Sequence, residues 1–330
     1  MADVRTKSGP VLVLGSVLSL QFGGAVAALL FPRAGVHGVV ALRLAIAALI
    51  LLAICRPRTR GYRRADWLSI AAFGIALAGL NTLFYHAIDR IPMGTAVTLE
   101  VLGPLTLSVI TARSRRGWMW AGLALAGVVL LGRGGFGRLD PAGVGFALGA
   151  AVMWAAYIVL SARVGHRFPK ADGLALAVAA SAVITLPFGV AEAGSVLLEP
   201  RILLMGTVVA VLASVLPYSL EMLALRRMPT TTFAVLMSLG PAVAALAGFL
   251  LLGQALTLLE CLAILLVITA AMGAVTGTKP APGAVTGTRP APGAVAGTKP
   301  APGPVSPASP VRTPSRTEAR RTLAPATPDA

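Results

Sequence analysis

Charged side chains are scarce in this sequence, and acidic ones are the scarcest. Charged residues make up 12% of the 330 residues, with 12 Asp or Glu against 28 Lys or Arg, whereas hydrophobic residues make up 56%. A soluble domain of this length could not bury so much apolar surface. The composition therefore excludes an ordinary soluble protein and predicts an all-α polytopic membrane protein.

Cysteines and catalytic motifs are also nearly absent. Cys55 and Cys261 lie in apolar segments without metal-ligand spacing, so they indicate neither a disulfide framework nor a metal site. The spacing of His86 and Asp89 fits no hydrolase geometry, and the sequence contains no P-loop and no GxSxG motif. We therefore expect no enzyme, no cofactor, no metal and no ATP-driven pump.

Apolar segments of near-spanning length follow one another along the chain. About 20 helical residues cross the roughly 30 Å of a bilayer interior. The first segment is too long for a signal peptide and lacks a convincing cleavage site, so we expect it to be retained. The predicted spans are 10–31, 37–55, 66–88, 92–111, 117–132, 142–162, 172–192, 202–224, 229–252 and 256–274.

Basic residues gather in alternate loops. With the N-terminus inside, fifteen Lys and Arg residues before the tail fall on the inner side and five on the outer side. This bias places both termini in the cytoplasm and the chain in the cell membrane. The net charge of +16 is thus explained by the loops and the tail, and we expect no nucleic-acid partner.

An internal repeat links the fourth span to the ninth. Ile91-Pro92 corresponds to Met228-Pro229, and at the same offset Gly103-Pro104 corresponds to Gly240-Pro241. An offset of five spans inverts the second copy, as in transporters built from inverted repeats. We predict a 5+5 repeat, with residues 1–138 as the first half and 139–274 as the second. The four Gly and Pro residues would let the two helices flex.

The last part of the chain has a different composition. Three ten-residue units of the type GAVTGTKPAP occupy Gly273–Pro302, and a Pro-, Thr- and Arg-rich end follows. Such a segment has too little apolar surface to offset its ordering entropy. We predict a disordered cytoplasmic tail over 275–330.

Two charged residues lie deep inside predicted spans. Glu100 is near the middle of its span and Arg43 has a similar depth, although a lone buried charge is costly. Together they could complement the carboxylate and ammonium of an amino acid. A permanent Arg43–Glu100 ion pair that only holds the bundle together is an equal alternative. Glu100 is the first candidate for proton coupling, and Glu221, nearer the inner end, is the second.

Uncharged polar residues are few inside the spans. They could line a translocation path, although such groups also form ordinary interhelical hydrogen bonds. These residues are Gln21, Asn81, Trp154, Tyr157 and Tyr218. Tyr85 and His86 lie near the outer interface, where we expect an aromatic belt.

Five stretches carry a resemblance to a known family. They are SLQFGG (Ser19–Gly24), ALRLAIAALILL (Ala41–Leu52), IPMGTAVTLEVLGPL (Ile91–Leu105), ALGAAVMWAAYIVL (Ala147–Leu160) and the segment Leu216–Thr257 that begins LPYSLEM. On these residues the chain, over about Pro10–Met272, resembles the ten-span EamA branch of the drug/metabolite transporter superfamily. Within that branch it is most similar to the bacterial inner-membrane exporters of threonine and homoserine.

The resemblance implies secondary-active export of a small metabolite, an amino acid of the threonine/homoserine type, exchanged for protons by alternating access. Glu100, Tyr218 and Glu221 match family residues. Gly240 and Gln254 stand where members often have Glu, so no coupling role carries over to them, and the specific substrate assignment is weakened.

The expected partners are a small-molecule substrate, protons and the lipid bilayer, and a homodimer is left open. Two alternatives remain: an exporter of a drug or other metabolite, and a membrane sensor or scaffold that transports nothing.

Overall fold

The computed structural model is a bundle of helices. It describes residues 2–57, 61–112, 115–133, 139–168, 171–225 and 227–277, and these ranges contain no β-strand. The predicted tail lies outside the described residues, except that Val275–Gly277 still belong to the last helix.

Thirteen α-helices make up the described bundle. They are α1 (Ala2–Ala28), α2 (Phe31–Cys55), α3 (Arg64–Arg90), α4 (Met93–Glu100), α5 (Leu102–Ala112), α6 (Arg115–Arg133), α7 (Pro141–Arg167), α8 (Asp172–Ala193), α9 (Pro200–Ala210), α10 (Leu216–Leu225), α11 (Thr230–Met237), α12 (Gly240–Leu252) and α13 (Leu258–Gly277). A 3-10 turn covers Gly194–Leu198 and a π turn covers Val211–Val215.

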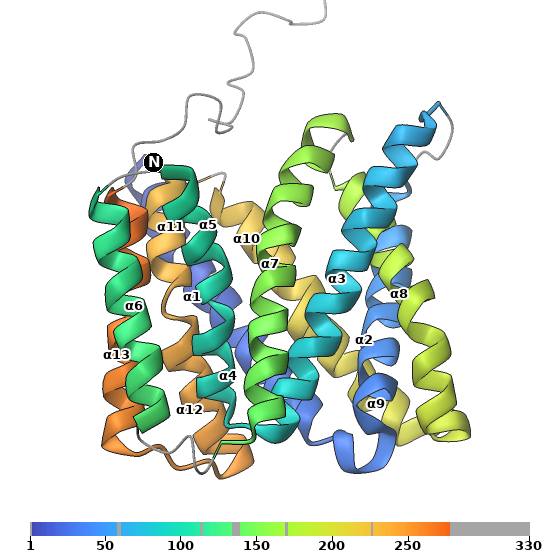
Figure 1. The fold of residues 1–330 in the computed structure, drawn as a ribbon. Helices are drawn as coiled ribbons and strands as arrows, with labels where there is room; N and C mark the ends of the chain where they lie inside the picture. Colours follow the sequence, from blue (N-terminus) through green and yellow to red (C-terminus); the bar gives the residue numbers. More distant parts are fainter. Residues whose placement is uncertain are drawn as a thin grey trace, which may run out of the picture. The chain divides into compact units, whose positions relative to one another are not determined.

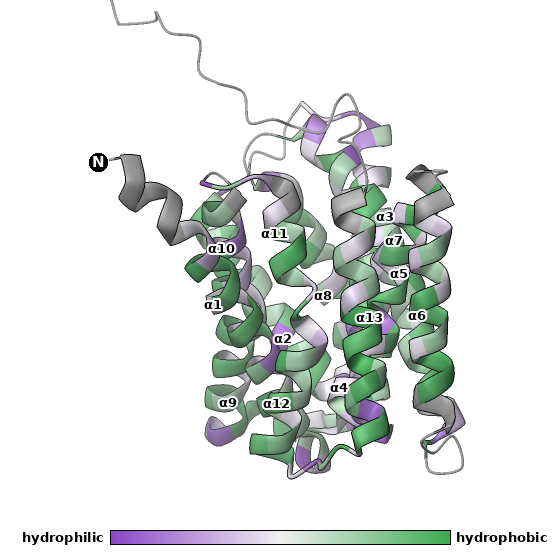
Figure 2. Cartoon of the chain, turned by 90° about the vertical axis from the view of Figure 1, so that its left-hand side faces the viewer, coloured by the Kyte–Doolittle hydropathy of each residue, from purple (hydrophilic) through white to green (hydrophobic). Residues whose placement is uncertain are grey.

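The predicted class, an all-α polytopic membrane protein, is confirmed. Eight segments of the described chain are long and apolar enough to cross a bilayer, and two shorter apolar helices, Gly117–Leu130 and Leu258–Ala274, stand at the fifth and tenth predicted spans. Figure 2 shows hydrophobic residues over most of the bundle and hydrophilic residues mainly near its two ends. Large apolar side chains such as Leu68 and Val183 are 72% exposed, as suits a surface in contact with lipid.

Two of the predicted single spans are broken in the same register. The fourth is interrupted between Glu100 and Leu102, and the ninth between Met237 and Gly240. Proline explains both breaks, because Pro104 has no N–H for the Glu100 carbonyl, and Pro241 has none for the Met237 carbonyl.

The eighth predicted span is also irregular. Between α9 and α10 the chain forms the π turn, where the Leu216 N–H bonds to the Val211 carbonyl five residues earlier. Pro217 follows directly and cannot donate to the Ala213 carbonyl. One backbone acceptor inside the bundle is thereby left for another partner.

The predicted start of the second span is wrong by six residues. α2 already begins at Phe31, with Pro32 in its first turn, and Gly35 interrupts its regular geometry at φ 66°. The apolar periodicity starts only after this kink, which is why the sequence pattern places the start at 37.

Packing pairs helices that are distant in sequence. α2 packs against α8, α3 against α7, α6 against α13, α4 against α12 and α1 against α10. In Figure 1, α6 and α13 stand together at one edge of the bundle, and α2 and α8 lie toward the opposite edge. The broken helices α4–α5 and α11–α12 lie between these edges, where they border a cavity.

Candidate functional site

One cavity of about 390 Å³ collects every polar residue that the sequence predicts for the site. Its size falls in the range of ordinary small-molecule sites. The residues that it brings together are Gln21, Arg43, Asn81, Glu100, Trp154, Tyr157, Tyr218 and Glu221. Of the four predicted flexing residues, Pro104 and Gly240 line the cavity, and Gly103 and Pro241 do not.

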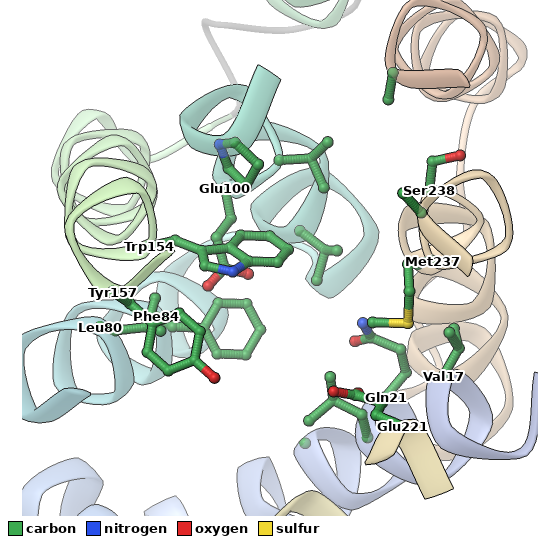
Figure 3. A pocket seen from close by; sticks show the side chains of 18 of the residues that line it. Val17, Gln21, Leu80, Phe84, Glu100, Trp154, Tyr157, Glu221, Met237 and Ser238 are labelled. Carbon is green, nitrogen blue, oxygen red and sulfur yellow. The ribbon is translucent and has the colours of Figure 1, made fainter. Parts of the chain in front are cut away.

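The cavity has two facing walls. Figure 3 shows Glu100, Trp154 and Tyr157 on one side, from α4 and α7, together with two apolar side chains of α3. Gln21 and Glu221 lie on the other side, from α1 and α10, beside Met237 and Ser238 at the break that follows α11. Acidic groups therefore face the same space from opposite walls.

Arg43 is held in a cradle of neutral groups. Its side chain is buried, and its Nε donates to Ser214 Oγ at 3.1 Å. One terminal nitrogen donates to the Tyr85 hydroxyl at 2.8 Å and the other to the Ala213 carbonyl at 2.8 Å. That carbonyl is the acceptor which Pro217 leaves open, so the π turn and the proline together form the cradle.

The alternative of a permanent Arg43–Glu100 ion pair is wrong. Within the described residues no hydrogen bond or ion pair joins the two side chains. A guanidinium carries five N–H donors, and three bonds are made here. Arg43 therefore retains N–H donors beside the cavity, and its charge acts on Glu100 only through space.

The aromatic-belt prediction is wrong for Tyr85. This side chain is fully buried, lines the cavity and bonds to Arg43, and the guanidinium carbon also lies 5.4 Å from its ring centroid. His86 instead faces His37, with 3.3 Å between their Nε2 atoms, and its ring stacks on that of Phe146 with 5.1 Å between the ring centroids.

The two cavity carboxylates have different surroundings. Glu221 accepts a hydrogen bond of 2.8 Å from Ser16 Oγ. Glu100, in the part of the chain that the structure describes, receives no hydrogen bond and forms no ion pair, and it sits directly at the α4–α5 break. Glu100 is thus the carboxylate available to a cationic group in the cavity.

The uncharged candidates also divide into two groups. Asn81 donates to the Leu77 carbonyl of its own helix at 2.7 Å, so part of its hydrogen-bonding capacity is used. The side chains of Gln21, Trp154, Tyr157 and Tyr218 make no hydrogen bond to another described residue, which leaves their polar groups for water or a ligand.

Polar contacts tie together the end of the bundle where α3 ends and α7 begins. Arg90 pairs with Asp140 at 3.3 Å, the Gly38 N–H donates to Glu192 at 3.1 Å, and the Met93 N–H donates to Gln254 at 3.0 Å. Each contact joins a residue before position 139 to one after it.

Sequence reasoning missed four members of the site: Ser16, Tyr85, Ala213 and Ser214. Small hydroxyl residues in apolar helices are too common to single out, and a backbone carbonyl has no sequence identity. Pro217 was the available indication, because a proline inside a helix frees the carbonyl four residues earlier. Across the described residues, no cluster of three or more His, Cys, Asp or Glu side chains could hold a metal ion.

Comparison with known proteins gives concordant results. The model of the EamA-like transporter family matches residues 141–276. The threonine/homoserine exporter RhtA of Salmonella typhimurium (strain SL1344) is 40% identical over 276 residues, which cover 83% of this chain and 93% of that protein. RhtA of Escherichia coli K12 is 39% identical over 266 residues, covering 80% and 90%.

More distant proteins are also similar. The uncharacterized transporter YwfM of Bacillus subtilis (strain 168) is 29% identical over 236 residues, which cover 67% of this chain and 80% of that protein. A crystal structure that is 20% identical superposes with a TM-score of 0.58 over 81% of this chain and 96% of its own, and this likeness concerns the fold alone. The chain belongs to the EamA-like transporter family of the drug/metabolite transporter superfamily and is similar to the bacterial threonine/homoserine exporters.

Proposed function

We propose that this protein is a secondary-active exporter of a small amino acid, exchanged for protons across the cytoplasmic membrane. One observation carries the proposal: one cavity inside an apolar bundle contains two acidic residues and an arginine that pairs with no carboxylate in the part of the chain that the structure describes. Charges are kept inside membranes chiefly for transport work. The similarity to proteins named as threonine/homoserine exporters supports the substrate class.

The cavity suits a zwitterion. The remaining N–H groups of Arg43 fit a substrate carboxylate, since a guanidinium binds carboxylates through paired donors. The free Glu100 carboxylate on the facing wall fits the substrate ammonium. The amide of Gln21 and the phenols of Tyr157 and Tyr218 offer hydrogen bonds to a side-chain hydroxyl, as in threonine or homoserine.

The two-halves architecture, 1–138 and 139–274, is part of the proposal. A shift of five spans converts the packing of α3 on α7 into that of α10 on α1, and the packing of α4–α5 on α7 into that of α11–α12 on α1. The two cavity walls exchange under the same shift. The EamA-like match over 141–276 coincides with the second half. Inverted halves around a midplane site are the usual basis of alternating access.

Alternating access requires contacts that form at one end and break at the other. The three polar contacts between the halves at the outer end would hold that side closed, and export would open them. Basic residues concentrated in the opposite loops support cytoplasmic termini. The helix breaks at Pro104 and Pro241 are the places where the walls could bend.

The test is counterflow in proteoliposomes. Purified protein is reconstituted, and uptake of labelled threonine and homoserine is measured with and without a pH gradient. We expect both substrates to exchange, and we expect Glu100→Gln to lose nearly all pH-driven flux because the ammonium site loses its charge. Glu199→Gln is the matched control, since Glu199 is exposed at the start of α9 and makes no side-chain capping bond.

Other outcomes have distinct meanings. Normal pH-driven flux in Glu100→Gln would remove this residue from the mechanism. Flux of another labelled metabolite without threonine or homoserine would move the protein to a different substrate. No flux with any substrate would favour a sensor or scaffold.

A further inference from the structure

The Glu221 carboxylate is attached to α1 through a single buried hydroxyl. Ser16 is fully buried, and its Oγ lies 2.8 Å from Glu221 Oε1 and 3.4 Å from the Pro217 carbonyl oxygen. A serine hydroxyl has one donor and two acceptor lone pairs, and it can rotate between partners. Ser16 therefore faces one acceptor that can change charge and one that cannot.

We propose that Ser16 is a positioning residue that makes Glu221 the proton-carrying carboxyl of the exporter and leaves Glu100 to the substrate ammonium. This inference rests on the proposed function and deepens it, because it separates two roles that the sequence alone assigns jointly to both glutamates.

Ser16 can satisfy Glu221 in either protonation state. When the carboxyl is charged, the Ser16 O–H donates to Oε1, as in the present structure. When a proton from cavity water binds Glu221, the carboxyl O–H can donate to Ser16 Oγ while the Ser16 O–H turns toward the Pro217 carbonyl. Neither state leaves a buried donor without an acceptor, so proton uptake and release need no repacking of α1 against α10.

Few other charges act on this pair. The elements packed against α10 are α1, the π turn and α11, and their described side chains include no titratable group. The phenols of Tyr157 and Tyr218, which are uncharged below about pH 10, lie near Glu221, and the ionisable side chains of Arg43 and Glu100 line the same cavity. Since Arg43 is held by its own cradle, the hydroxyl of Ser16 is the one side-chain donor bonded to Glu221 in the described chain.

Ser19 supplies a matched control on the same helix. It lies one turn further along α1, and its Oγ donates to the Leu212 carbonyl at 2.6 Å. Its hydroxyl therefore makes an equally local bond between α1 and the eighth span, but to an acceptor that never changes charge. Removal of this bond should weaken packing without touching a proton site.

The experiment compares the pH dependence of threonine exchange in proteoliposomes for wild type, Ser16→Ala, Ser19→Ala, Glu221→Gln and the Ser16→Ala/Glu221→Gln double variant. We expect the half-maximal pH of Ser16→Ala to rise by about one unit, because the charged carboxylate loses a hydrogen bond. Ser19→Ala should keep the wild-type midpoint. The double variant should match Glu221→Gln alone, because Ser16 would act only through that carboxyl.

Each contrary result is decisive. An unchanged midpoint in Ser16→Ala, or the same shift in Ser19→Ala, would overturn the role of Ser16. Additive losses in the double variant would show that Ser16 acts through packing. If wild type itself exchanged no substrate, the proposed function would fail, and that outcome is distinct from either of these.

Discussion

The two broken helices share the same proline pattern but differ in the side chain that stands at the break. Both begin after a proline, and both break four residues before a second proline. At the first break stands Glu100 and at the second stands Met237, and both line the cavity. The comparison shows that the repeated backbone supplies two equivalent openings, whereas the ionisable group was placed in only one of them.

The glycines before the second prolines differ just as clearly. A Cβ on Gly103 would overlap the Ala151 carbonyl of α7, so this glycine permits a close helix–helix approach. A Cβ on Gly240 would lie 3.6 Å from Gln21 Nε2, which is ordinary contact. The first break is therefore packed tightly against α7, whereas the second borders the cavity.

The largest expected effect tests this difference in packing. Gly103→Ala should destabilise the protein by about 1–3 kcal/mol or more, because the backbone of α7 must move to admit the methyl group. Gly240→Ala should leave stability unchanged. Thermal unfolding in detergent, with the yield of monodisperse protein, measures both. Equal stability of the two variants would refute the tight packing of Gly103 against α7.

A smaller effect separates the two prolines. Pro104→Ala supplies an N–H for the Glu100 carbonyl, so it should join α4 to α5 and displace the carboxylate, and we expect the counterflow rate to fall roughly tenfold. Pro241→Ala restores the bond at Met237, where no charge sits, and should reduce the rate by only about two- to threefold. Similar losses in both would mean that the break matters and the carboxylate position does not.

The smallest effect concerns the N-terminal ends of the same two broken helices. Neither preceding residue, Pro92 before α4 or Pro229 before α11, makes a side-chain capping bond, and the first N–H of α4, at Met93, is instead capped by Gln254. Gln254→Ala should lower stability by about 1 kcal/mol, which corresponds to roughly 2–4 °C in Tm. Gln254→Glu keeps an acceptor and should remain near wild type. A Tm unchanged in Gln254→Ala would show that the cap contributes nothing.

The sequence predicts which residues line the site better than it predicts the hydrogen bonds between them. Polar side chains are so costly in lipid that those inside spans must face the protein interior, and this explains why all eight predicted residues, Glu100 and Trp154 among them, line one cavity. Gly-Pro pairs likewise predict where the helices break. The partners of Arg43 are harder to predict: Pro217 indicates that the Ala213 carbonyl is free, but only the π turn shows that this carbonyl reaches Arg43.

Helix boundaries and depth also escaped prediction where local geometry departs from the ideal. The kink at Gly35 hides the true start of α2, and the burial of Tyr85 depends on how α3 packs against α2, where Arg43 bonds to it. Neither feature changes the hydropathy pattern. The ten-span count and the 5+5 division remain predictions that the contact pattern supports.

The cradle of Arg43 has a consequence for genetics. The oxygen that seats the guanidinium belongs to the main chain at Ala213, so no side-chain replacement there can delete it. What exposes that oxygen is the ring of Pro217, one helical turn away. Loss-of-function substitutions would thus be expected at Pro217, a residue that makes no hydrogen bond to the arginine and acts only by leaving the Ala213 carbonyl free for it.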